Sequence, residues 1–392
     1  MREPLVVTIQ INGQVEDGWE PVLRAFINNF ENQNEVGASV CVMHEGETKV
    51  DLWAGVVDDD GTPWQEDTMV VFHSATKGGV ALAAHLLADR GHLDLDAPVS
   101  EIWPEFATRG KEKVTNRMML NHTAGVAAFR EALPGKSALD WDYVCDRLAA
   151  EEPWWEPGSR NGYHMATFGW TVGELVRRSS GQSLGSFFRS EVAEPANADF
   201  WIGLPKNEHH RVSNLIRYKP VRGEKFSSYT EAFLADKESM QAKAWYHRGG
   251  AESNDPDSWE AELGGGGGIG NARGLARVYN APALGEFVGS VQAARMSRVS
   301  VATESDAMLL LPTAFSEGFM KRMDNTGNQS GDHDSVLIGD RAFGHVGMGG
   351  SIGFADPDIG LTMGYAMNRL GKSILLDSRG QSLVDAAYSC CQ

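Results

Sequence analysis

The sequence predicts an α/β (α+β) fold in which strands from both ends of the chain form one sheet and a mainly helical segment is inserted between them. Two observations lead to this prediction. Hairpin patterns, with apolar strands on either side of a turn signal, occur near both termini. From about residue 98 to residue 243 the pattern is mostly helical, and this stretch carries several tryptophans, which suits a packed helical unit beside a wet cleft.

The N-terminal elements follow from short-range patterns. The dipeptide Glu45-Gly46 separates two apolar stretches and predicts the turn of a β-hairpin. After Ser74 the pattern becomes helical through Ala88 and stops at Gly91, a residue type that is typical of helix ends. The first predicted strand, the amphipathic segment, the two hairpin strands and an apolar run are residues 5–9, 19–30, 38–43, 49–53 and 69–72.

The middle and C-terminal elements are predicted in the same way. A run of five glycines at residues 264–268 opens a helix at residues 271–279. A second hairpin lies near the C-terminus, around the turn Asp356-Pro357-Asp358. The helical segments of the middle region are residues 118–120, 141–148, 168–177 and 184–188, and the strands of the second hairpin are residues 351–355 and 361–367.

Composition and charge exclude several classes of protein. With 42% hydrophobic and 22% charged residues over 392 positions, a sizeable core is expected and wholesale disorder is excluded. The net charge of −18 disfavours nucleic acid and anionic membrane surfaces as partners. No run approaches the ~20 apolar residues that span a bilayer, and the N-terminus lacks the features of a signal peptide. We therefore expect a cytoplasmic protein.

The cysteines and histidines predict neither a disulfide scaffold nor a metal site. Cys41, Cys145, Cys390 and Cys391 show no CxxC spacing and no paired pattern. The last two lie at the extreme C-terminus, where we expect fraying rather than regular structure. The histidine pair at 209–210 and the other scattered histidines lack i,i+4 spacing with a carboxylate partner, so no metal and no cofactor are predicted.

A serine and a lysine three residues apart form the strongest candidate for chemistry. In residues 73–77 (HSATK), Ser74 and Lys77 fall on one face of the first turn of the predicted helix. A serine hydroxyl is a weak nucleophile until a base takes its proton, and a lysine amine acts as that base only when it is neutral. The usual lysine pKa is about 10.4, and the helix N-terminus and partial burial would both lower it.

Several further motifs follow this S-x-x-K pair, in an order and spacing that are more specific than any one of them. They are residues 119–125 (MLNHTAG), 155–158 (WEPG), 161–164 (NGYH), 168–170 (FGW) and 344–357 (GHVGMGGSIGFADP). From about Gly37 to Asn368 the chain resembles the serine β-lactamase superfamily, and within it the family VIII carboxylesterases, which are similar to class C β-lactamases. The resemblance implies a β-lactamase/D,D-peptidase-like fold with a mainly antiparallel sheet flanked by helices. It also implies an α/β domain from residues 1–97 and 255–392, an inserted helical domain from residues 98–254, and an active site in the groove between them.

The resemblance also implies catalytic roles. Ser74 matches the nucleophile, Lys77 its base, and Tyr163 the tyrosine whose phenolate helps to deprotonate the serine and later protonates the leaving group. The Tyr-x-Asn motif of class C β-lactamases is replaced here by residues 163–165 (YHM), and the Lys-Thr-Gly motif by residues 345–347 (HVG). The amide and the cation that contact a β-lactam are therefore missing, and Met348 stands where family VIII esterases commonly have tryptophan.

The residues themselves agree with these roles. The Tyr163 hydroxyl both donates and accepts, and it could act as a base if Lys77 stabilised its phenolate. Residues 347–350 are predicted to be a strand whose bare backbone approaches the substrate. The backbone N–H groups of Ser74 and Met348 then form a candidate oxyanion hole. The predicted substrate-binding residues are His345, Gly347, Gly349, Trp154 and Trp155, with the tryptophans lining an apolar acyl pocket.

Two other motifs offer weaker candidates. Residues 349–353 (GGSIG) match the G-x-S-x-G nucleophile elbow, but that elbow needs a strand before it and a helix after it, whereas a strand and an Asp-Pro turn follow Ser351. Residues 265–270 match G-x-G-x-x-G without a βαβ unit or an acidic residue on a second strand. We expect these glycines to let a loop pass close to the cleft instead.

The sequence therefore predicts a serine carboxylesterase that cleaves short-chain or aryl esters of small molecules through an acyl-enzyme on Ser74, with Lys77 and Tyr163 as base and acid. Alternatives on the same scaffold are a β-lactamase, a D-aminopeptidase-like amidase or an acyltransferase. A catalytically silent penicillin-binding protein is a further alternative of another class. The oligomeric state, the natural substrate and the division of base work between Lys77 and Tyr163 stay open.

Overall fold

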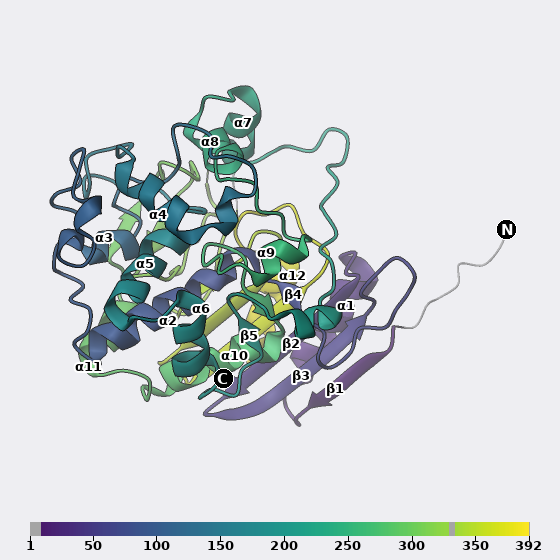
Figure 1. The fold of residues 1–392 in the computed structure, drawn as a ribbon. Coiled ribbons are helices and arrows are strands. Elements are labelled where there is room, and N and C mark those ends of the chain that lie inside the picture. The colour runs from purple at the N-terminus through teal and green to yellow at the C-terminus, as the bar shows by residue number, and fades with distance from the viewer. Residues whose placement is uncertain (1–8, 329–333, 392) are drawn as a thin grey trace.

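A six-stranded antiparallel sheet in the order β1-β3-β2-β11-β10-β9 forms one side of the molecule, with β1 at its outer edge (Figure 1). The computed structural model describes residues 9–328 and 334–391. Three strands come from the N-terminal part and three from the C-terminal part, and the two groups meet where β2 pairs with β11. The prediction of a mainly antiparallel sheet built from both ends of the chain is confirmed. These strands are β1 (Ile11–Val15), β2 (Gly37–His44), β3 (Glu47–Gly55), β9 (Phe343–Val346), β10 (Ile352–Asp356) and β11 (Leu361–Met367).

Both predicted hairpins are present. The β2–β3 turn consists of Glu45 and Gly46, with φ of 49° and 85°, the pair of positive values that a type I′ turn requires. Strands β10 and β11 pair directly across the turn that follows Asp356. Short strands complete two smaller sheets: β4 (Val70–Val71), β5 (Phe200–Trp201) and β6 (Ile269–Gly270) in one, and β7 (Val301–Thr303) and β8 (Thr313–Phe315) in the other.

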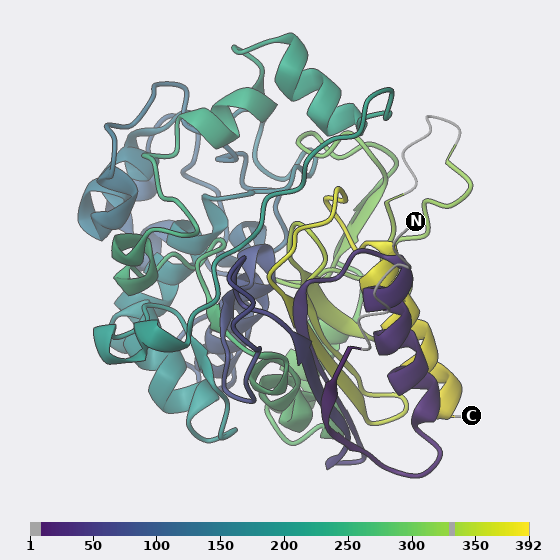
Figure 2. The ribbon, with the colours of Figure 1, turned by 90° about the vertical axis from the view of Figure 1, so that its right-hand side faces the viewer.

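Helices cover both faces of the large sheet. Helices α1 (Glu20–Asn32) and α12 (Ser378–Cys390) lie side by side on one face, and α10 (Ala272–Leu284) packs on the other (Figure 2). Glycines allow the close approach of α10: a Cβ at Gly364 would lie 2.0 Å from the carbonyl oxygen of Ala272, and one at Gly353 would lie 2.9 Å from the Tyr279 ring. Because these two glycines carry no side chain, α10 can pack directly against β10 and β11.

The remaining helices gather beside the sheet rather than on it (Figure 1). Helix α2 begins at Thr76 and packs against α5, which places the start of α2 in the interior. The prediction of helices over residues 118–120, 141–148, 168–177 and 184–188 is confirmed, whereas the division into domains at residues 98 and 254 stays a prediction. The bounds are α2 (Thr76–Asp89), α3 (Asn116–Leu120), α4 (Trp141–Ala150), α5 (Phe168–Ser180), α6 (Leu184–Phe188), α7 (Ser228–Ala235), α8 (Met240–Tyr246), α9 (Pro256–Glu260) and α11 (Ser290–Ser297). Within the described residues, no helix combines the length and the apolar character needed to cross a bilayer.

Three sequence-based expectations need correction or fall outside the description. Residues 5–8 of the strand expected at 5–9 lie outside the described residues. The fraying expected at Cys390 and Cys391 is absent, because Cys390 is the last residue of α12 and Cys391 its C-cap, and the apolar side of this helix packs on the sheet. Residues 347–350 form a turn instead of a strand: Gly349 and Gly350 have φ of 93° and 126°, and the Gly350 N–H bonds back to the Gly347 carbonyl.

Candidate active site

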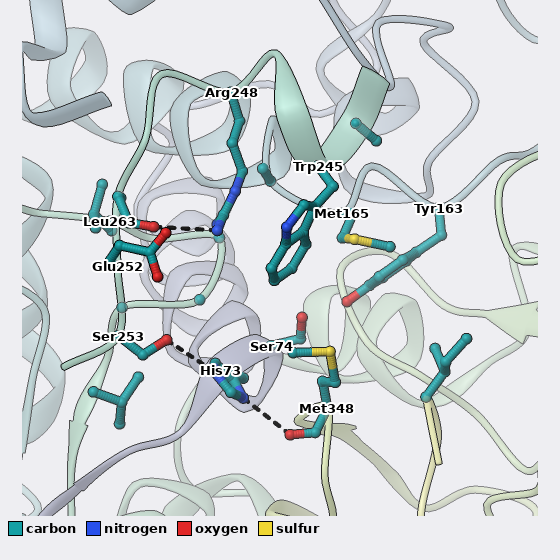
Figure 3. A pocket seen from close by; sticks show the side chains of 18 of the residues that line it. His73, Ser74, Tyr163, Met165, Trp245, Arg248, Glu252, Ser253, Leu263 and Met348 are labelled. Atoms are coloured by element: carbon teal, nitrogen blue, oxygen red, sulfur yellow. Dashed lines mark hydrogen bonds between the residues drawn. The ribbon is translucent and has the colours of Figure 1, made fainter. Parts of the chain in front are cut away.

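Ser74 lies in a single 3-10 turn, η1 (His73–Ala75), that leads directly into α2. His73, the residue before it, has φ of 48°, a left-handed conformation that is uncommon for a residue other than glycine. Neither η1 nor α2 receives a side-chain cap, so the Ser74 hydroxyl does not serve as an ordinary helix N-cap. The backbone therefore presents this hydroxyl to a cavity, where Figure 3 shows it close to Met348.

The Lys77 amine makes three short contacts and is fully buried. Its Nζ lies 3.1 Å from the Ser74 Oγ, 2.7 Å from the Met165 carbonyl and 2.6 Å from the Gly265 carbonyl. Burial holds the pKa of Lys77 well below its usual range, and no carboxylate of the described residues forms an ion pair with it. A neutral amine has two N–H bonds and one lone pair. Donating both N–H bonds to the two carbonyls leaves the lone pair directed at the Ser74 hydroxyl.

Tyr163 is a second side chain in contact with the Ser74 hydroxyl. Its backbone N–H donates to the buried Asp306 carboxylate at 3.0 and 3.1 Å from the two oxygens, which anchors the residue at the end of its loop. The Lys77 Nζ lies 4.9 Å from the centre of the Tyr163 ring. Burial raises the pKa of the Tyr163 phenol, although a hydrogen bond with Ser74 acts in the opposite direction. Burial thus opposes formation of the phenolate, whose role as a base stays a prediction from the resemblance.

Three buried histidines surround Tyr163, and we refer to His122, His164 and His345 as the histidine cluster. The His345 Nε2 lies 3.5 Å from the Tyr163 hydroxyl, and its Nδ1 bonds to the Val346 carbonyl at 2.7 Å. Because a carbonyl only accepts, the proton is on Nδ1, and Nε2 is free to accept from the phenol. Burial lowers the pKa of His345 to about 3 and that of His164 to about 4, and it also lowers the pKa of His122.

The predicted oxyanion-hole groups lie at the same end of the cavity. In the described part of the chain, the backbone N–H groups of Ser74 and Met348 have no hydrogen-bond partner. His73 fixes the Met348 segment, since its Nδ1 donates to the Met348 carbonyl at 2.9 Å while its Nε2 contacts the Ser253 hydroxyl at 3.0 Å. A Cβ at Gly347 would lie 2.0 Å from the Phe72 carbonyl, so the two segments are in backbone contact.

Ser74 opens into a cavity of about 360 Å³, a size that suits a small organic molecule. Its wall is largely apolar and aromatic, and it also carries the side chain of Arg248 (Figure 3). Helices α7 and α8 supply one side of this wall. The aromatic and sulfur-bearing residues of the lining are Tyr163, Met165, Trp170, Tyr229, Phe233, Trp245, Trp259, Met320 and Met348.

The structure places the two tryptophans that were predicted as the acyl-pocket wall away from this lining. The Trp154 indole donates to the Ala128 carbonyl at 2.8 Å, with the Arg130 guanidinium 4.2 Å above its ring. The Trp155 indole donates to the Thr123 carbonyl at 3.3 Å. These anchors hold both rings in the surrounding structure, and Trp170, Trp245 and Trp259 line the cavity instead.

Three other predicted substrate contacts also lie behind the cavity wall. His345 is 1% exposed and supports Tyr163. Gly347 faces the Phe72 carbonyl, and Gly349 faces Leu370, because each lacks the side chain that would clash there. Met348 alone of this segment lines the cavity.

The alternative motifs have structural explanations. The Ser351 hydroxyl is 3% exposed and donates to the Phe72 carbonyl at 2.7 Å, which joins β10 to the segment before Ser74. Gly265, Gly266 and Gly267 line the cavity, so the glycine run passes close to the cleft as expected. Among the described residues, no group of three or more histidine, cysteine or acidic side chains is arranged to hold a metal ion.

This geometry agrees with what the chain as a whole resembles. The family model described as beta-lactamase matches residues 23–385. The chain belongs to the beta-lactamase family. The sequence-based prediction of a β-lactamase/D,D-peptidase-like fold is thereby confirmed, as is the resemblance stated from the motifs.

Individual proteins are similar to this chain over nearly its whole length. The crystal structure of a family VIII carboxylesterase has a TM-score of 0.86 at 36% identity and covers 97% of this chain and 100% of its own. A penicillin-binding protein homologue from Caulobacter crescentus has a TM-score of 0.85 at 32% identity, with the same coverage. The curated esterase/beta-lactamase LipL of Mycobacterium tuberculosis (strain ATCC 25618 / H37Rv) is 33% identical over 372 residues, which is 92% of this chain and 83% of that protein.

Two charged residues of this beta-lactamase family member escaped the sequence analysis. Asp306 follows Glu304 and Ser305 in an ordinary polar stretch, and Arg248 precedes a glycine pair, Gly249-Gly250. Neither belongs to a motif with a known spacing. Only the structure brings Asp306 beneath Tyr163 and Arg248 to the cavity wall.

Proposed function

We propose that the protein is a serine carboxylesterase that hydrolyses short-chain or aryl esters through an acyl-enzyme on Ser74. One observation carries the proposal: the Ser74 hydroxyl contacts a buried, depressed-pKa lysine at 3.1 Å and a protonated tyrosine, at the end of an aromatic cavity. The names of relatives with 33% and 36% identity, an esterase/beta-lactamase and a family VIII carboxylesterase, support the same chemistry.

In the proposed acylation step, the Ser74 proton moves to the lone pair of Lys77 while Oγ attacks the ester carbonyl carbon. The negative charge that develops on the carbonyl oxygen is stabilised by the N–H groups of Ser74 and Met348, a kind of donor typically worth about 3 kcal/mol each. Tyr163 gives its phenolic proton to the departing alkoxide, and the proton held by Lys77 restores the phenol. The alcohol leaves neutral, and water then attacks the acyl-enzyme with the same groups in reverse roles.

The depressed pKa of Lys77 and the raised pKa of Tyr163 favour one division of labour. A neutral Lys77 is the base, and a protonated Tyr163 is the acid that the leaving group needs. His345 supports this arrangement because its neutral Nε2 accepts from the phenol and orients it. His345 is thus a positioning residue and not a substrate contact.

Serine-directed labelling tests the nucleophile. A fluorophosphonate should add one adduct to the wild type and to the control variant Ser351→Ala, and none to Ser74→Ala. The Ser74→Ala variant should fold normally, because Ser74 caps no helix. An adduct that is lost in Ser351→Ala and kept in Ser74→Ala would contradict the proposal.

The alternative of β-lactam hydrolysis is tested with a pair of chromogenic substrates. A 4-nitrophenyl butyrate ester should be turned over with a much larger kcat/KM than nitrocefin. Met165 stands in place of the Tyr-x-Asn amide, and its apolar side chain lines the cavity. His345 stands in place of the Lys-Thr-Gly lysine, and it is neutral and buried. They offer a lactam carboxylate or side-chain amide no partner, and such a group loses water without compensation. Comparable kcat/KM values for the two substrates would favour the β-lactamase alternative.

A further inference from the structure

Arg248 is the one arginine in the lining of the Ser74 cavity, and few of its hydrogen-bond donors are used within the described part of the protein. Its guanidinium has five N–H groups, of which one donates to a protein acceptor, the Ala251 carbonyl, at 3.1 Å. No carboxylate of the described residues forms an ion pair with it. The acidic side chain of the lining, Glu252, is paired with Arg217 at 3.1 Å instead.

The guanidinium is held in place although it lacks a charged partner. It lies 4.2 Å from the centre of the Trp245 ring, and both side chains line the cavity (Figure 3). Stacking on an aromatic face orients the planar fork and leaves its edge available for hydrogen bonds. Burial lowers the pKa of Arg248, with Glu252 and Tyr229 acting in the opposite direction, yet an arginine stays protonated at neutral pH.

Arg248 is half-buried in a mainly aromatic cavity, and a ligand that supplies the opposite charge would compensate for the water its guanidinium loses on binding. The planar fork of arginine matches a carboxylate with two parallel hydrogen bonds. We propose that the substrates are small esters that carry a carboxylate, which Arg248 binds while the ester group lies at Ser74. This inference rests on the proposed esterase function and names the substrate class of that same site.

The cavity volume of about 360 Å³ limits the spacer between the two groups to a few methylenes or one aromatic ring. The carboxylate could belong to the acyl part, as in a monoester of a dicarboxylic acid, or to the alcohol part, as in an acylated hydroxybenzoate. The chemistry at Arg248 is the same in both cases, and matched substrates distinguish them.

The experiment compares charged and neutral esters of equal size. For the acyl side, the pair is 4-nitrophenyl hydrogen glutarate and 4-nitrophenyl pentanoate; for the alcohol side, it is 4-(butyryloxy)benzoate and 4-(butyryloxy)benzamide. We expect the wild type to prefer the charged member of at least one pair. Arg248→Gln should lower kcat/KM for that charged ester by about 10- to 100-fold and change the neutral ester by less than about threefold.

Arg341→Gln is the matched control, because it removes the same charge from an exposed arginine that, like its partner Asp358, does not line the cavity. It should leave the charge preference within about twofold of the wild type. An equal loss for charged and neutral esters in Arg248→Gln would assign Arg248 a structural role and overturn the inference. So would a wild type that prefers the neutral member of both pairs.

A binding measurement separates this inference from the proposed function. Calorimetric titration of Ser74→Ala with the two benzoate and benzamide esters needs no turnover. The charged ester should bind more tightly, and adding Arg248→Gln should remove the difference. If the wild type cleaves none of the esters but this difference is present, the esterase proposal fails while the carboxylate site stands. If turnover is present and neither pair shows a charge preference, the esterase proposal stands and the carboxylate site fails.

Discussion

Replacement of Asp306 should reduce activity through Tyr163 without touching the substrate. The Asp306 carboxylate is fully buried and accepts from several donors at once. One oxygen accepts from the backbone N–H groups of Tyr163, Met308 and Leu309 at 2.8 to 3.0 Å. The other accepts from the Asn161 amide at 3.1 Å. Asp306 thus ties the loop that carries Tyr163 to the segment after residue 306.

The size of the effect follows from these contacts. Asp306→Ala leaves three backbone donors and the Thr313 hydroxyl without this acceptor, while the Asn161 amide keeps the Thr313 oxygen. Each orphaned buried group costs about 1–3 kcal/mol. Burial raises the pKa of the Asp306 carboxyl, so removing the charge recovers part of that loss. We expect the free energy of unfolding to fall by about 3–5 kcal/mol. A shift of Tyr163 by about 1 Å should lower kcat/KM for a butyryl ester by about 100-fold.

Asp306→Asn separates a positioning role from a general loss of stability. The asparagine oxygen still accepts from the three backbone N–H groups, and its amide can pair with Asn161 once that side chain turns over. This variant should recover most of kcat/KM and lose about 1–2 kcal/mol of stability in urea unfolding. Asp324→Ala is the control, because Asp324 is exposed and bonds to Arg322 and Thr326, its neighbours along the chain. If Asp306→Ala kept wild-type kcat/KM, the reasoning that links Asp306 to Tyr163 would be refuted.

Three further predictions address the base, the glycine run and the histidine cluster. Lys77→Arg should slow acylation nearly as much as Lys77→Ala, because arginine keeps a charge but cannot deprotonate; stopped-flow measurements with Tyr163→Phe and the double variant should show losses that do not add. For the wild type, kcat/KM should rise with pH as the Lys77 amine deprotonates, and this limb should lie well below the usual lysine pKa; a limb near pH 10 would contradict a buried neutral lysine. Gly169→Ala should lower activity by at least tenfold, since its Cβ would lie 2.0 Å from the Gly265 nitrogen and displace the carbonyl that holds Lys77, whereas Gly135→Ala meets no atom within 4 Å and should be neutral in the same ester assay. The histidine cluster has lowered pKa values in the folded state, so the unfolded state binds more protons below about pH 6.5. The contribution of these histidines to the free energy of unfolding should therefore be fully present above pH 6.5. It should fall by up to about 1.4 kcal/mol per pH unit for each histidine as the pH is lowered toward 4. Urea midpoints that do not change between pH 6.5 and pH 4 would contradict the assignment.

Local patterns were enough to predict much of the fold. The turn at Glu45-Gly46, the helix after Ser74 and the hairpin around residues 356–358 depend on neighbours within a few positions, and all are present in the structure. The order and spacing of the motifs indicated the β-lactamase-type fold, and the family comparison confirms it. The same spacing predicted Ser74, Lys77 and Tyr163 as the candidate catalytic residues. Their catalytic roles stay proposals.

Other features of the site were decided by contacts between residues far apart in the sequence. The sequence predicted Trp154 and Trp155 as the pocket wall because they are large and near a motif, but their indole N–H groups bond to carbonyls elsewhere and fix them outside the lining. His345 was predicted to touch substrate, whereas β9 places it behind Tyr163. A motif specifies which residue type occupies a position. It does not specify which contacts hold that side chain outside the cavity.

The sequence by itself determined the residue types of the proposed nucleophile, base and acid and the order of strands and helices that carries them. Only the tertiary structure decided the protonation states of Lys77 and Tyr163, because these depend on burial among segments up to 188 residues apart. It also decided that Arg248 faces the Ser74 cavity without an ion pair in the described part of the chain. The free energy of a charge depends on all the groups packed around it in space, and a linear pattern records only the neighbours along the chain.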